Sequence, residues 1–202
     1  MDGPIDPEIG LEDETDDHGM TLDFRIEEAK DILDRIINFI RLADDKANIT
    51  MAVIGVIITA TAMAGGNGIV NVVNSFKSSI DAFPLIVLSI LIFSGMLLAY
   101  GFFYLLKTVY PDTTDKAGIE DEKMVSESVI YFKHVASIKS YSDYELKFSR
   151  YSKDQYYNDI LAQAYINARI CTEKADMLQK GFKASVVGVA VLLIAIGLSF
   201  IA

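Results

Sequence analysis

The chain has 202 residues, of which 51% are apolar, and a formal net charge of −10. With a mean hydropathy of +0.31, it holds more apolar material than one small soluble core normally buries. Eight acidic side chains and no lysine or arginine fall in the first twenty residues, so the rest of the chain is nearly balanced in charge. The composition argues against nucleic-acid binding, which calls for a concentrated basic face.

Residues 1–20 are predicted to be a disordered acidic tail. They are rich in Asp, Glu, Gly and Pro and offer little to bury on folding. A secretory signal begins with a positively charged region, so no signal peptide is predicted here.

Residues 21–46 are predicted to form a cytosolic amphipathic helix. Thr21 can cap its start, because a side-chain oxygen at that position accepts a bond from an exposed backbone N–H. Alternating steps of four and three separate a set of apolar or small residues, which is the spacing of a heptad seam. This first seam consists of Leu22, Ile26, Ala29, Leu33, Ile36, Ile40, Ala43 and Ala47. No residue forces a break before Ala64, so one helix is expected to run from the cytosol into the bilayer.

Three blocks contain no Asp, Glu, Lys, Arg or His: residues 49–64, 83–106 and 184–202. About 20 apolar residues in a helix cross a hydrocarbon core roughly 30 Å thick. Lys46 can reach back to the interface with its apolar stem, which lengthens the first block. Transmembrane helices are predicted at 47–65, 83–106 and 184–202. The predicted fold is an all-α membrane protein with three transmembrane helices, two of them continuous with long cytosolic heptad-patterned helices that form a helical bundle.

The distribution of the 18 basic residues predicts the orientation in the membrane. Lys and Arg are retained on the cytoplasmic side of membrane spans. Five precede the first block, only Lys77 lies in the loop 66–82, and the other twelve lie in segment 107–183. We therefore expect a multi-pass protein of the plasma membrane with a cytoplasmic N-terminus, an external loop at 66–82 and a cytosolic helical module at 107–183.

The cytosolic module carries a second heptad seam, which runs toward the third span. It consists of Tyr157, Leu161, Ala164, Ala168, Cys171, Ala175, Leu178 and Phe182. The spacing of Ser152 and Gln155, and of Ser142 and Glu145, is that of a capping box at a helix start. These signals predict a short helix at 143–150 and a long one from about residue 153. Segment 129–136 is apolar, β-branched and aromatic, and its state stays open between a short helix and a strand-like insertion.

Small residues four apart occur in two of the spans, where they permit close helix contact. These pairs are Gly95 with Ala99 and Ala184 with Gly188. The single cysteine, Cys171, excludes an intrachain disulfide. Neither a transition-metal ligand set nor a catalytic motif is recognisable, so we expect a protein that is not an enzyme and has no cofactor.

Three motifs, taken in order, resemble a known family. They are Arg41-Leu-Ala-Asp-Asp-Lys-Ala47 before the first span, Val129-Ile-Tyr-Phe-Lys-His-Val-Ala-Ser137, and Gln163-Ala-Tyr-Ile-Asn-Ala-Arg-Ile170 followed by Lys174. This order resembles the transmembrane effectors of Pycsar, the bacterial cyclic-pyrimidine antiphage system, over residues 25–202. Lys133 departs from the family, which usually has a small residue there, and the acidic linker before it is longer.

The resemblance implies an effector of antiphage defence in the cell membrane. Such an effector senses a cyclic nucleotide, cyclic CMP or cyclic UMP, made by a partner cyclase, and impairs membrane integrity. Its expected partners are this nucleotide, the lipid bilayer and further copies of the chain, with no nucleic acid. Two alternatives remain open, a ligand-gated ion pathway outside defence and a non-enzymatic membrane scaffold.

Candidate ligand-binding residues follow from the resemblance, because aromatic rings stack on bases and Arg and Lys bind phosphate. They are Arg41, Asp44, Lys46, Tyr131, His134, Asn167, Arg169 and Lys174. Each also fits a solvated helix face or an interfacial charge. Asp44 at the mouth of a span is costly to leave unpaired, so we expect it to pair with Arg169, Lys174 or Lys180 and to set a resting state.

Overall fold

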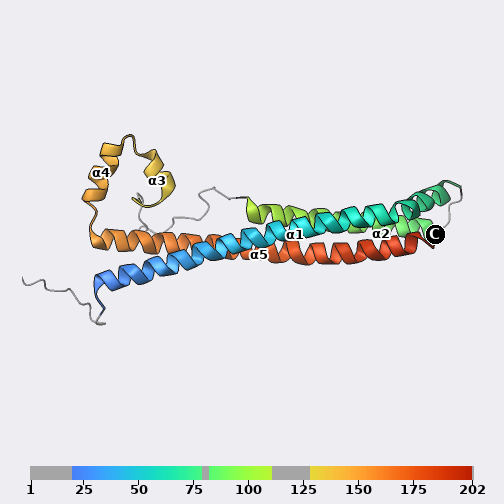
Figure 1. Ribbon diagram of the computed structural model, residues 1–202, viewed down its shortest axis with the longest axis horizontal. Coiled ribbons are helices and arrows are strands. Elements are labelled where there is room, and N and C mark those ends of the chain that lie inside the picture. The colour runs from blue at the N-terminus through green and yellow to red at the C-terminus, as the bar shows by residue number, and fades with distance from the viewer. Residues whose placement is uncertain (1–19, 79–81, 111–127, 202) are drawn as a thin grey trace, which may run out of the picture. The chain divides into compact units, whose positions relative to one another are not determined.

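The computed structural model describes residues 20–78, 82–110 and 128–201, with the side chains of 76–78 excepted (Figure 1). Within these ranges the chain is helical and has no strand. Five helices follow in order: α1 (Leu22–Ser78), α2 (Ala82–Val109), α3 (Phe132–Ser137), α4 (Tyr141–Ser149) and α5 (Lys153–Ser199). The predicted all-α class is confirmed, whereas the predicted disorder of the tail and the acidic linker lie outside the described residues.

Three of the helices are long and apolar enough to cross a membrane. Their most apolar 18-residue windows have mean hydropathies of 1.9 in α1, 2.5 in α2 and 2.2 in α5. The first and the last of them in the chain, α1 and α5, are each a single helix that includes both a predicted amphipathic segment and a predicted span. The predicted continuity between seams and spans is therefore confirmed.

Segment 66–82 differs from the expected loop, because α1 continues through it to Ser78. Two glycines of this part of α1 serve helix packing. A Cβ at Gly65 would lie 2.7 Å from Cγ2 of Ile196, and one at Gly68 would lie 2.4 Å from Oγ of Ser199. The glycines let α1 and α5 approach each other closely. The external location of this segment remains a prediction.

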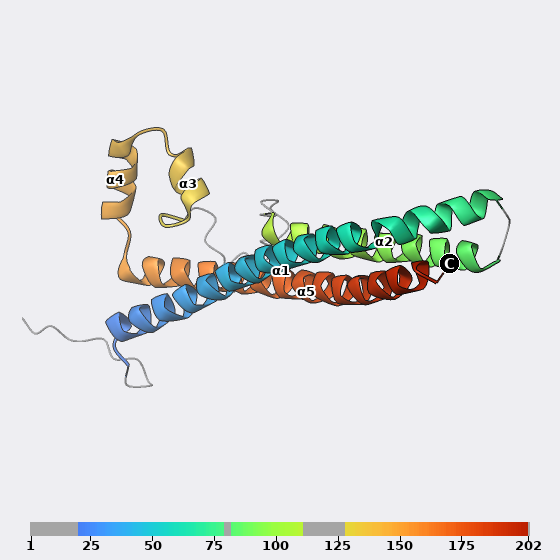
Figure 2. The same cartoon turned by 45° about the vertical axis from the view of Figure 1, so that its right-hand side comes forward.

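The described residues belong to two compact units, which we call unit 1 and unit 2. Of the described residues, unit 1 comprises 20–35 and 128–166, and unit 2 comprises 36–78, 82–110 and 167–201. In unit 2, the helices α1, α2 and α5 lie side by side (Figure 1 and Figure 2). The buried residues that join them are Ala47, Ile54, Leu98 and Leu105, with Met51, Val109, Leu178, Val189 and Leu192 packed around them.

A close contact in unit 2 joins α2 to α5 through small residues. A Cβ at Gly101 would lie 3.0 Å from the carbonyl oxygen of Gly181, so neither position has room for a side chain. Gly188 packs in the same way against Leu98, as the sequence suggested. The other suggested pair is wrong at Gly95, where no atom lies within 4 Å of an added Cβ.

The two predicted seams fare differently. Every residue of the first seam is buried or half-buried in α1. The second seam, in α5, is found in part. Five of its residues are buried or half-buried, whereas Leu161, Ala175 and Phe182 are exposed and the neighbouring Ile160 and Gly181 are buried. Polar residues also occupy inner positions of α5, and a search for apolar periodicity passes over them. Among these inner polar residues are Asp159, Gln163 and Lys174.

Unit 1 joins the first part of α1 and of α5 to the short helices α3 and α4. Its buried core is Ile26, Ala29 and Ile160. As predicted, Thr21 caps α1, since its hydroxyl accepts a bond from the backbone N–H of Phe24 at 3.3 Å. In Figure 2, α3 and α4 stand next to each other, joined by a short connection.

The start of α5 has the predicted capping box. The N–H of Ser152 donates to Oε1 of Gln155 at 2.9 Å, and the N–H of Gln155 donates to the Ser152 hydroxyl at 3.1 Å. The box predicted at Ser142 is wrong, because α4 begins two residues earlier. Ser140 is the cap, and its hydroxyl accepts from the N–H of Asp143 at 3.1 Å.

Candidate functional site

A buried carboxylate forms the centre of the polar network in unit 1. Asp159 lies on α5 with its side chain fully buried. Its Oδ2 accepts a hydrogen bond from the Ser128 hydroxyl at 2.8 Å and another from the N–H of Val129 at 3.1 Å. Both donors lie in the segment that leads into α3, so Asp159 ties this segment to α5.

Ser128 organises the turn before α3. Its hydroxyl oxygen accepts from the N–H groups of Ile130 at 3.1 Å and Tyr131 at 2.8 Å. The N–H of Ser128 donates to Nδ1 of His134 at 3.0 Å. Since Nδ1 is the acceptor, the proton of a neutral His134 ring resides on Nε2. The open state of segment 129–136 is thus resolved as a tight turn followed by the short helix α3.

Aromatic rings gather on this turn and on α4. The Tyr131 ring meets Phe132 edge-on at 5.0 Å and His134 edge-on at 5.2 Å between ring centroids. On α4, the Tyr144 hydroxyl donates to the carbonyl of Val129 at 3.2 Å. We call Tyr131, Phe132 and His134 the aromatic cluster. Phe132 is 67% exposed, so the cluster presents a ring face to which a planar ligand has access.

Tyr151 lies just before α5, close to the Asp159 carboxylate. Burial raises the pKa of its phenol above 10.0, and the nearby Asp159 carboxylate raises it further. The other oxygen of that carboxylate, Oδ1, is buried without a hydrogen-bond partner. A buried carboxylate with one oxygen unmatched retains the capacity to accept a further hydrogen bond.

Cations from α1 lie over aromatic rings of α5 within unit 1. The Arg25 guanidinium is 4.8 Å from the centre of the Tyr157 ring, and the Lys30 ammonium is 5.2 Å from that of Tyr156. A further ion pair joins Asp23 and Lys153 at 2.8 Å on the exposed surface. These contacts hold the start of α1 in a parallel register with the start of α5, each adding about 0.5–1 kcal/mol at most for exposed groups.

Asp44 pairs with Lys174 in unit 2, within α1 and α5 and five residues before the first apolar block begins at Ile49. The Lys174 side chain is 11% exposed and that of Asp44 is 30% exposed, so the pair is largely removed from water. Of the three cations expected as partners, Lys174 is the one found. Arg169 is exposed, and the Lys180 ammonium lies 6.0 Å from the Tyr104 ring centre.

The structure brings together two pairs of the predicted ligand residues: Tyr131 with His134 in unit 1, and Asp44 with Lys174 in unit 2. The other four also belong to unit 2. Arg41, Lys46 and Arg169 are exposed, and Asn167 is half-buried. A role for any of these eight residues in ligand binding remains a prediction.

Sequence reasoning missed the residues that organise the cluster: Ser128, Tyr144, Tyr151 and Asp159. They are neither cations nor rings in the segments singled out as ligand contacts. One signal was available, since Asp159 lies directly beside the apolar Ile160, where a carboxylate is costly to bury without partners. Among the described residues, no group of three His, Cys, Asp or Glu side chains lies close enough to hold a metal ion.

The three apolar helices define the chain as a membrane protein. The Pycsar effector protein domain matches residues 28–201, and the chain belongs to this family. It is therefore an effector of antiphage defence that acts downstream of a cyclase and its cyclic nucleotide signal, and is not the cyclase itself. No curated protein and no solved structure matches the chain. The resemblance seen in the sequence is thus confirmed at the level of the family.

Proposed function

We propose that this effector binds a cyclic pyrimidine mononucleotide, cyclic CMP or cyclic UMP, in the cytosol and responds by impairing the membrane that holds it. One observation carries the proposal. The helices α1 and α5 are each uninterrupted from unit 1, where the aromatic cluster lies, to the end of an apolar span. A change in unit 1 can therefore reach the membrane along helices that have no break to act as a hinge.

The aromatic cluster suits the base of such a ligand. A pyrimidine can stack on the exposed ring of Phe132 or on Tyr131, because ring stacking accepts any base. The Nε2–H of His134 is a donor for a phosphate oxygen, since its Nδ1 already accepts from Ser128. Lys133, between Phe132 and His134 in the sequence, adds positive charge that favours an anion.

The Ser128–Asp159 hydrogen bond supplies the proposed link to α5. Ligand binding on the turn displaces Ser128 and Val129, and both donate to the same carboxylate oxygen. Since Asp159 belongs to α5, the displacement acts directly on that helix. The Asp44–Lys174 pair then serves as the resting contact that activation breaks, which deepens the role expected for Asp44.

The proposed output is loss of membrane integrity through an assembly of several copies. The blocks 49–64, 83–106 and 184–202 contain no Asp, Glu, Lys, Arg or His, so they offer no internal relay of carboxylates or basic side chains of the kind that transporters use. A pore or lesion formed by several chains needs no such relay. We place the N-terminus in the cytoplasm of a multi-pass protein in the plasma membrane, as the distribution of Lys and Arg favours.

Co-expression with a cyclase tests this function in cells. A cyclic-pyrimidine cyclase, active or catalytically dead, is expressed with the effector while a voltage-sensitive dye reports the membrane potential. Depolarisation is expected when the effector is expressed with the active cyclase and not with the dead one. The depolarisation is expected to disappear when Tyr131 and His134 of the effector are both changed to Ala. If the membrane potential stays intact although the effector is stably inserted and the cyclic nucleotide is detected in the cells, the proposal is refuted and the scaffold alternative is favoured.

A further inference from the structure

The last part of α1 carries a row of exposed residues along one face. Its members follow one another in steps of four, three, four and three, and all are exposed: Ala60, Ala64, Asn67, Asn71 and Asn74. We call them the asparagine row. Such steps are the spacing of a heptad seam, which keeps side chains on one side of a helix. This side of α1 therefore presents two small residues followed by three carboxamides.

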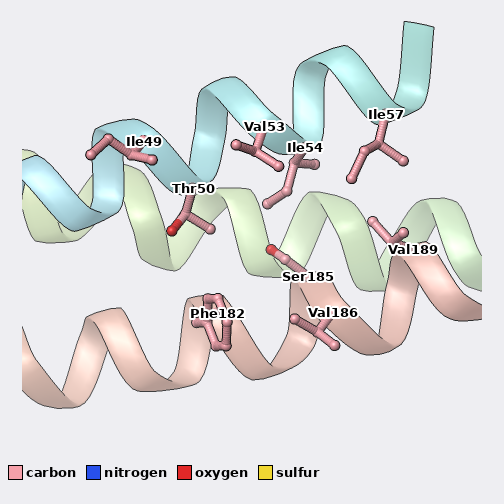
Figure 3. Close-up of a pocket in the computed structure, with 9 residues that line it drawn as sticks. All are labelled: Ile49, Thr50, Val53, Ile54, Ile57, Phe182, Ser185, Val186 and Val189. Atoms are coloured by element: carbon pink, nitrogen blue, oxygen red, sulfur yellow. The ribbon is translucent and has the colours of Figure 1, made fainter. Parts of the chain in front are cut away.

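The asparagine row lies on a different face of α1 from the contacts with α5. Gly65 and Gly68 pack against α5. In Figure 3, Ile54 and Ile57 point toward α5 across an apolar pocket of about 340 Å³ that Val189 also lines. One residue turns a helix by about 100°, so the row lies roughly a third of a turn around α1 from the two glycines. Its side chains thus face outward from the three helices.

Contacts between α2 and α5 give the level of the bilayer midplane on α5. Gly101 meets Gly181 while Leu98 meets Gly188, so the two helices run in opposite directions. The midpoint of the apolar block 83–106 lies about three residues before Leu98 on α2. With this block centred in the bilayer, the midplane crosses α5 about three residues after Gly188.

The depth of Asn67 follows from the contact between α1 and α5. Gly65 packs against Ile196, which lies about five residues beyond the midplane level on α5. Asn67 is two residues further along α1, so it is about 10 Å from the midplane and inside the hydrocarbon core, whose half-thickness is about 15 Å. Asn71 falls at the boundary of that core. The membrane part of α1 then extends beyond the predicted span, which ended at residue 65.

A carboxamide at the depth of Asn67 needs a hydrogen-bond partner, because hydrocarbon offers none. The neighbouring hydroxyls have partners within the helix: Thr59 donates to the carbonyl of Gly55 at 2.9 Å, and Thr61 to that of Ile57 at 2.6 Å. Among the residues that the structure describes, none forms a hydrogen bond with the exposed side chain of Asn67. Its amide is therefore available to a group outside this chain.

A second copy of the chain has the chemistry that this face selects. Copies inserted in the same direction bring each residue of the row opposite itself. A carboxamide has both donors and an acceptor, so Asn67 can pair with its own counterpart. Like charges would repel in this arrangement, and the sequence has no Asp, Glu, Lys, Arg or His between Lys46 and Lys77. Ala60 and Ala64, four residues apart, let two helices approach closely.

We propose that the asparagine row is the contact through which copies of this effector associate in the membrane. Asn67 pairs with its counterpart in the hydrocarbon core, and Asn71 and Asn74 continue the contact beyond it. The inference rests on the proposed function for its consequence, which is the assembly that impairs the membrane. The contact itself forms without nucleotide.

Disulfide cross-linking of single-cysteine variants tests the row. Cys171→Ser removes the one native cysteine, and Ala64→Cys then places a thiol in the row, one turn before Asn67. Ala62→Cys is the matched control, because Ala62 is also a small exposed residue but lies on roughly the opposite side of α1 from the row. Each purified full chain is reconstituted without nucleotide at a high ratio of lipid to protein and oxidised with copper phenanthroline.

Dimers linked through Ala64→Cys are expected at several times the yield of dimers linked through Ala62→Cys. Adding Asn67→Leu is expected to weaken the association by about 3- to 30-fold, the range for a lost hydrogen bond between membrane helices. Asn67→Gln keeps the carboxamide and is expected to retain most of the cross-linking. Equal yields at the two cysteine positions would overturn the proposal. Labelling of Ala64→Cys by a membrane-impermeant thiol reagent, with no dimer, would also overturn it and assign the row to a water-filled path.

Leakage from the same vesicles, reduced and then titrated with cyclic CMP and cyclic UMP, separates this contact from the proposed function. Nucleotide-dependent leakage without dimers through the row would refute the contact and leave the function standing. Dimers through the row without leakage at saturating nucleotide would support the contact and refute the function.

Discussion

Asp44 of α1 and Lys174 of α5 form an ion pair across a sequence separation of 130 residues. The Asp23–Lys153 pair in unit 1 has the same separation of 130 residues. In each unit the two helices are thus parallel and in the same register, since a residue on α1 meets a partner a fixed number of positions later on α5. The Asp44–Lys174 pair is less exposed than the Asp23–Lys153 pair, so we expect its removal to cause the larger loss of stability.

A charge exchange at this pair tests whether it sets the resting state. Asp44→Lys and Lys174→Asp alone each place two like charges together in a largely buried site, and each is expected to destabilise the resting helix contact by about 1.5–3 kcal/mol. The double exchange is expected to restore most of that loss. Leakage from vesicles without nucleotide is the measurement, with high leakage for the single variants and low leakage for the double variant.

Asp45→Lys is the matched control for this exchange, because Asp45 is the exposed neighbour. It changes the net charge as Asp44→Lys does but leaves the pair intact, so resting leakage is expected to stay low. If both single variants and the double variant all keep wild-type leakage and ligand response, the pair has no role in the resting state.

Two glycines of α2 give a second prediction with a built-in comparison. Gly101→Ala places a methyl group 2.9 Å from the backbone nitrogen of Ser185 and 3.0 Å from the carbonyl of Gly181, so α2 and α5 must move apart. A loss of about 1–3 kcal/mol is expected from such overpacking. Gly95→Ala meets no atom within 4 Å and is expected to be neutral or to stabilise α2 by up to about 1 kcal/mol.

Resistance to unfolding by sodium dodecyl sulfate distinguishes the two glycine variants. The midpoint of unfolding is expected at a lower detergent concentration for Gly101→Ala and at an unchanged or higher one for Gly95→Ala. Equal midpoints would mean that the close contact between α2 and α5 contributes nothing to stability.

The Ser128 hydroxyl is expected to hold the turn before α3 in place. Ser128→Ala removes the acceptor of the Ile130 and Tyr131 N–H groups and one donor to Asp159. A destabilisation of this segment by about 1–3 kcal/mol follows, because buried groups lose their partners. Hydrogen exchange of the amides at 129–131 is expected to accelerate.

Ser149→Ala serves as the control for the turn variant. This exposed hydroxyl donates only to the carbonyl of Leu146 within its own helix, so exchange at 129–131 is expected to remain slow. Unchanged protection in the Ser128 variant would show that the turn does not depend on the hydroxyl.

The raised pKa of Tyr151 predicts a loss of stability at high pH. In the unfolded chain this phenol ionises near 10.0, whereas the folded chain keeps it protonated to a higher pH because of burial and the Asp159 carboxylate. The folded state then binds more protons than the unfolded state, and the free energy of unfolding falls as the pH rises above about 10. Tyr151→Phe removes this contribution.

Denaturant midpoints at pH 9 and pH 11 provide the measurement for Tyr151. The decrease between the two values is expected to be smaller in Tyr151→Phe than in the wild type, and unchanged in Tyr141→Phe, which alters an exposed tyrosine of α4. An identical decrease in all three proteins would rule out a stabilising role for the protonated Tyr151 phenol.

Periodicity and block length were sufficient to predict most of the helical architecture. The first seam, the uninterrupted helix from Leu22 through the first apolar block and the caps at Thr21 and Ser152 are found as predicted. These features depend on local rules, in which a hydroxyl caps the next turn and apolar residues follow the helix repeat. The same rules misplaced the start of α4, because Ser140 and Asp143 offer the same spacing two residues earlier.

Features that depend on contacts between distant residues were harder to predict. Residues 66–78 were expected in a loop but belong to α1, where Gly65 and Gly68 pack closely against Ile196 and Ser199 of α5. The bond between Ser128 and Asp159 joins residues 31 positions apart and has no periodic pattern. The α5 seam was found only in part, and it passed over Asp159 and Lys174, which occupy inner positions because of partners that sequence periodicity does not reveal. The Asp44–Lys174 pair was foreseen because an unpaired charge at that depth is unfavourable.

Dye leakage from vesicles that carry the purified chain tests whether binding of a cyclic pyrimidine nucleotide makes this effector impair the membrane. Cyclic CMP, cyclic UMP and cyclic AMP are titrated separately, and binding of each is measured on the same samples. Leakage is expected with a cyclic pyrimidine nucleotide over the concentrations at which that nucleotide binds. Little leakage is expected with cyclic AMP, and none when Tyr131 and His134 are both replaced by Ala. Saturating binding of a cyclic pyrimidine without leakage or loss of membrane potential would contradict the proposed function.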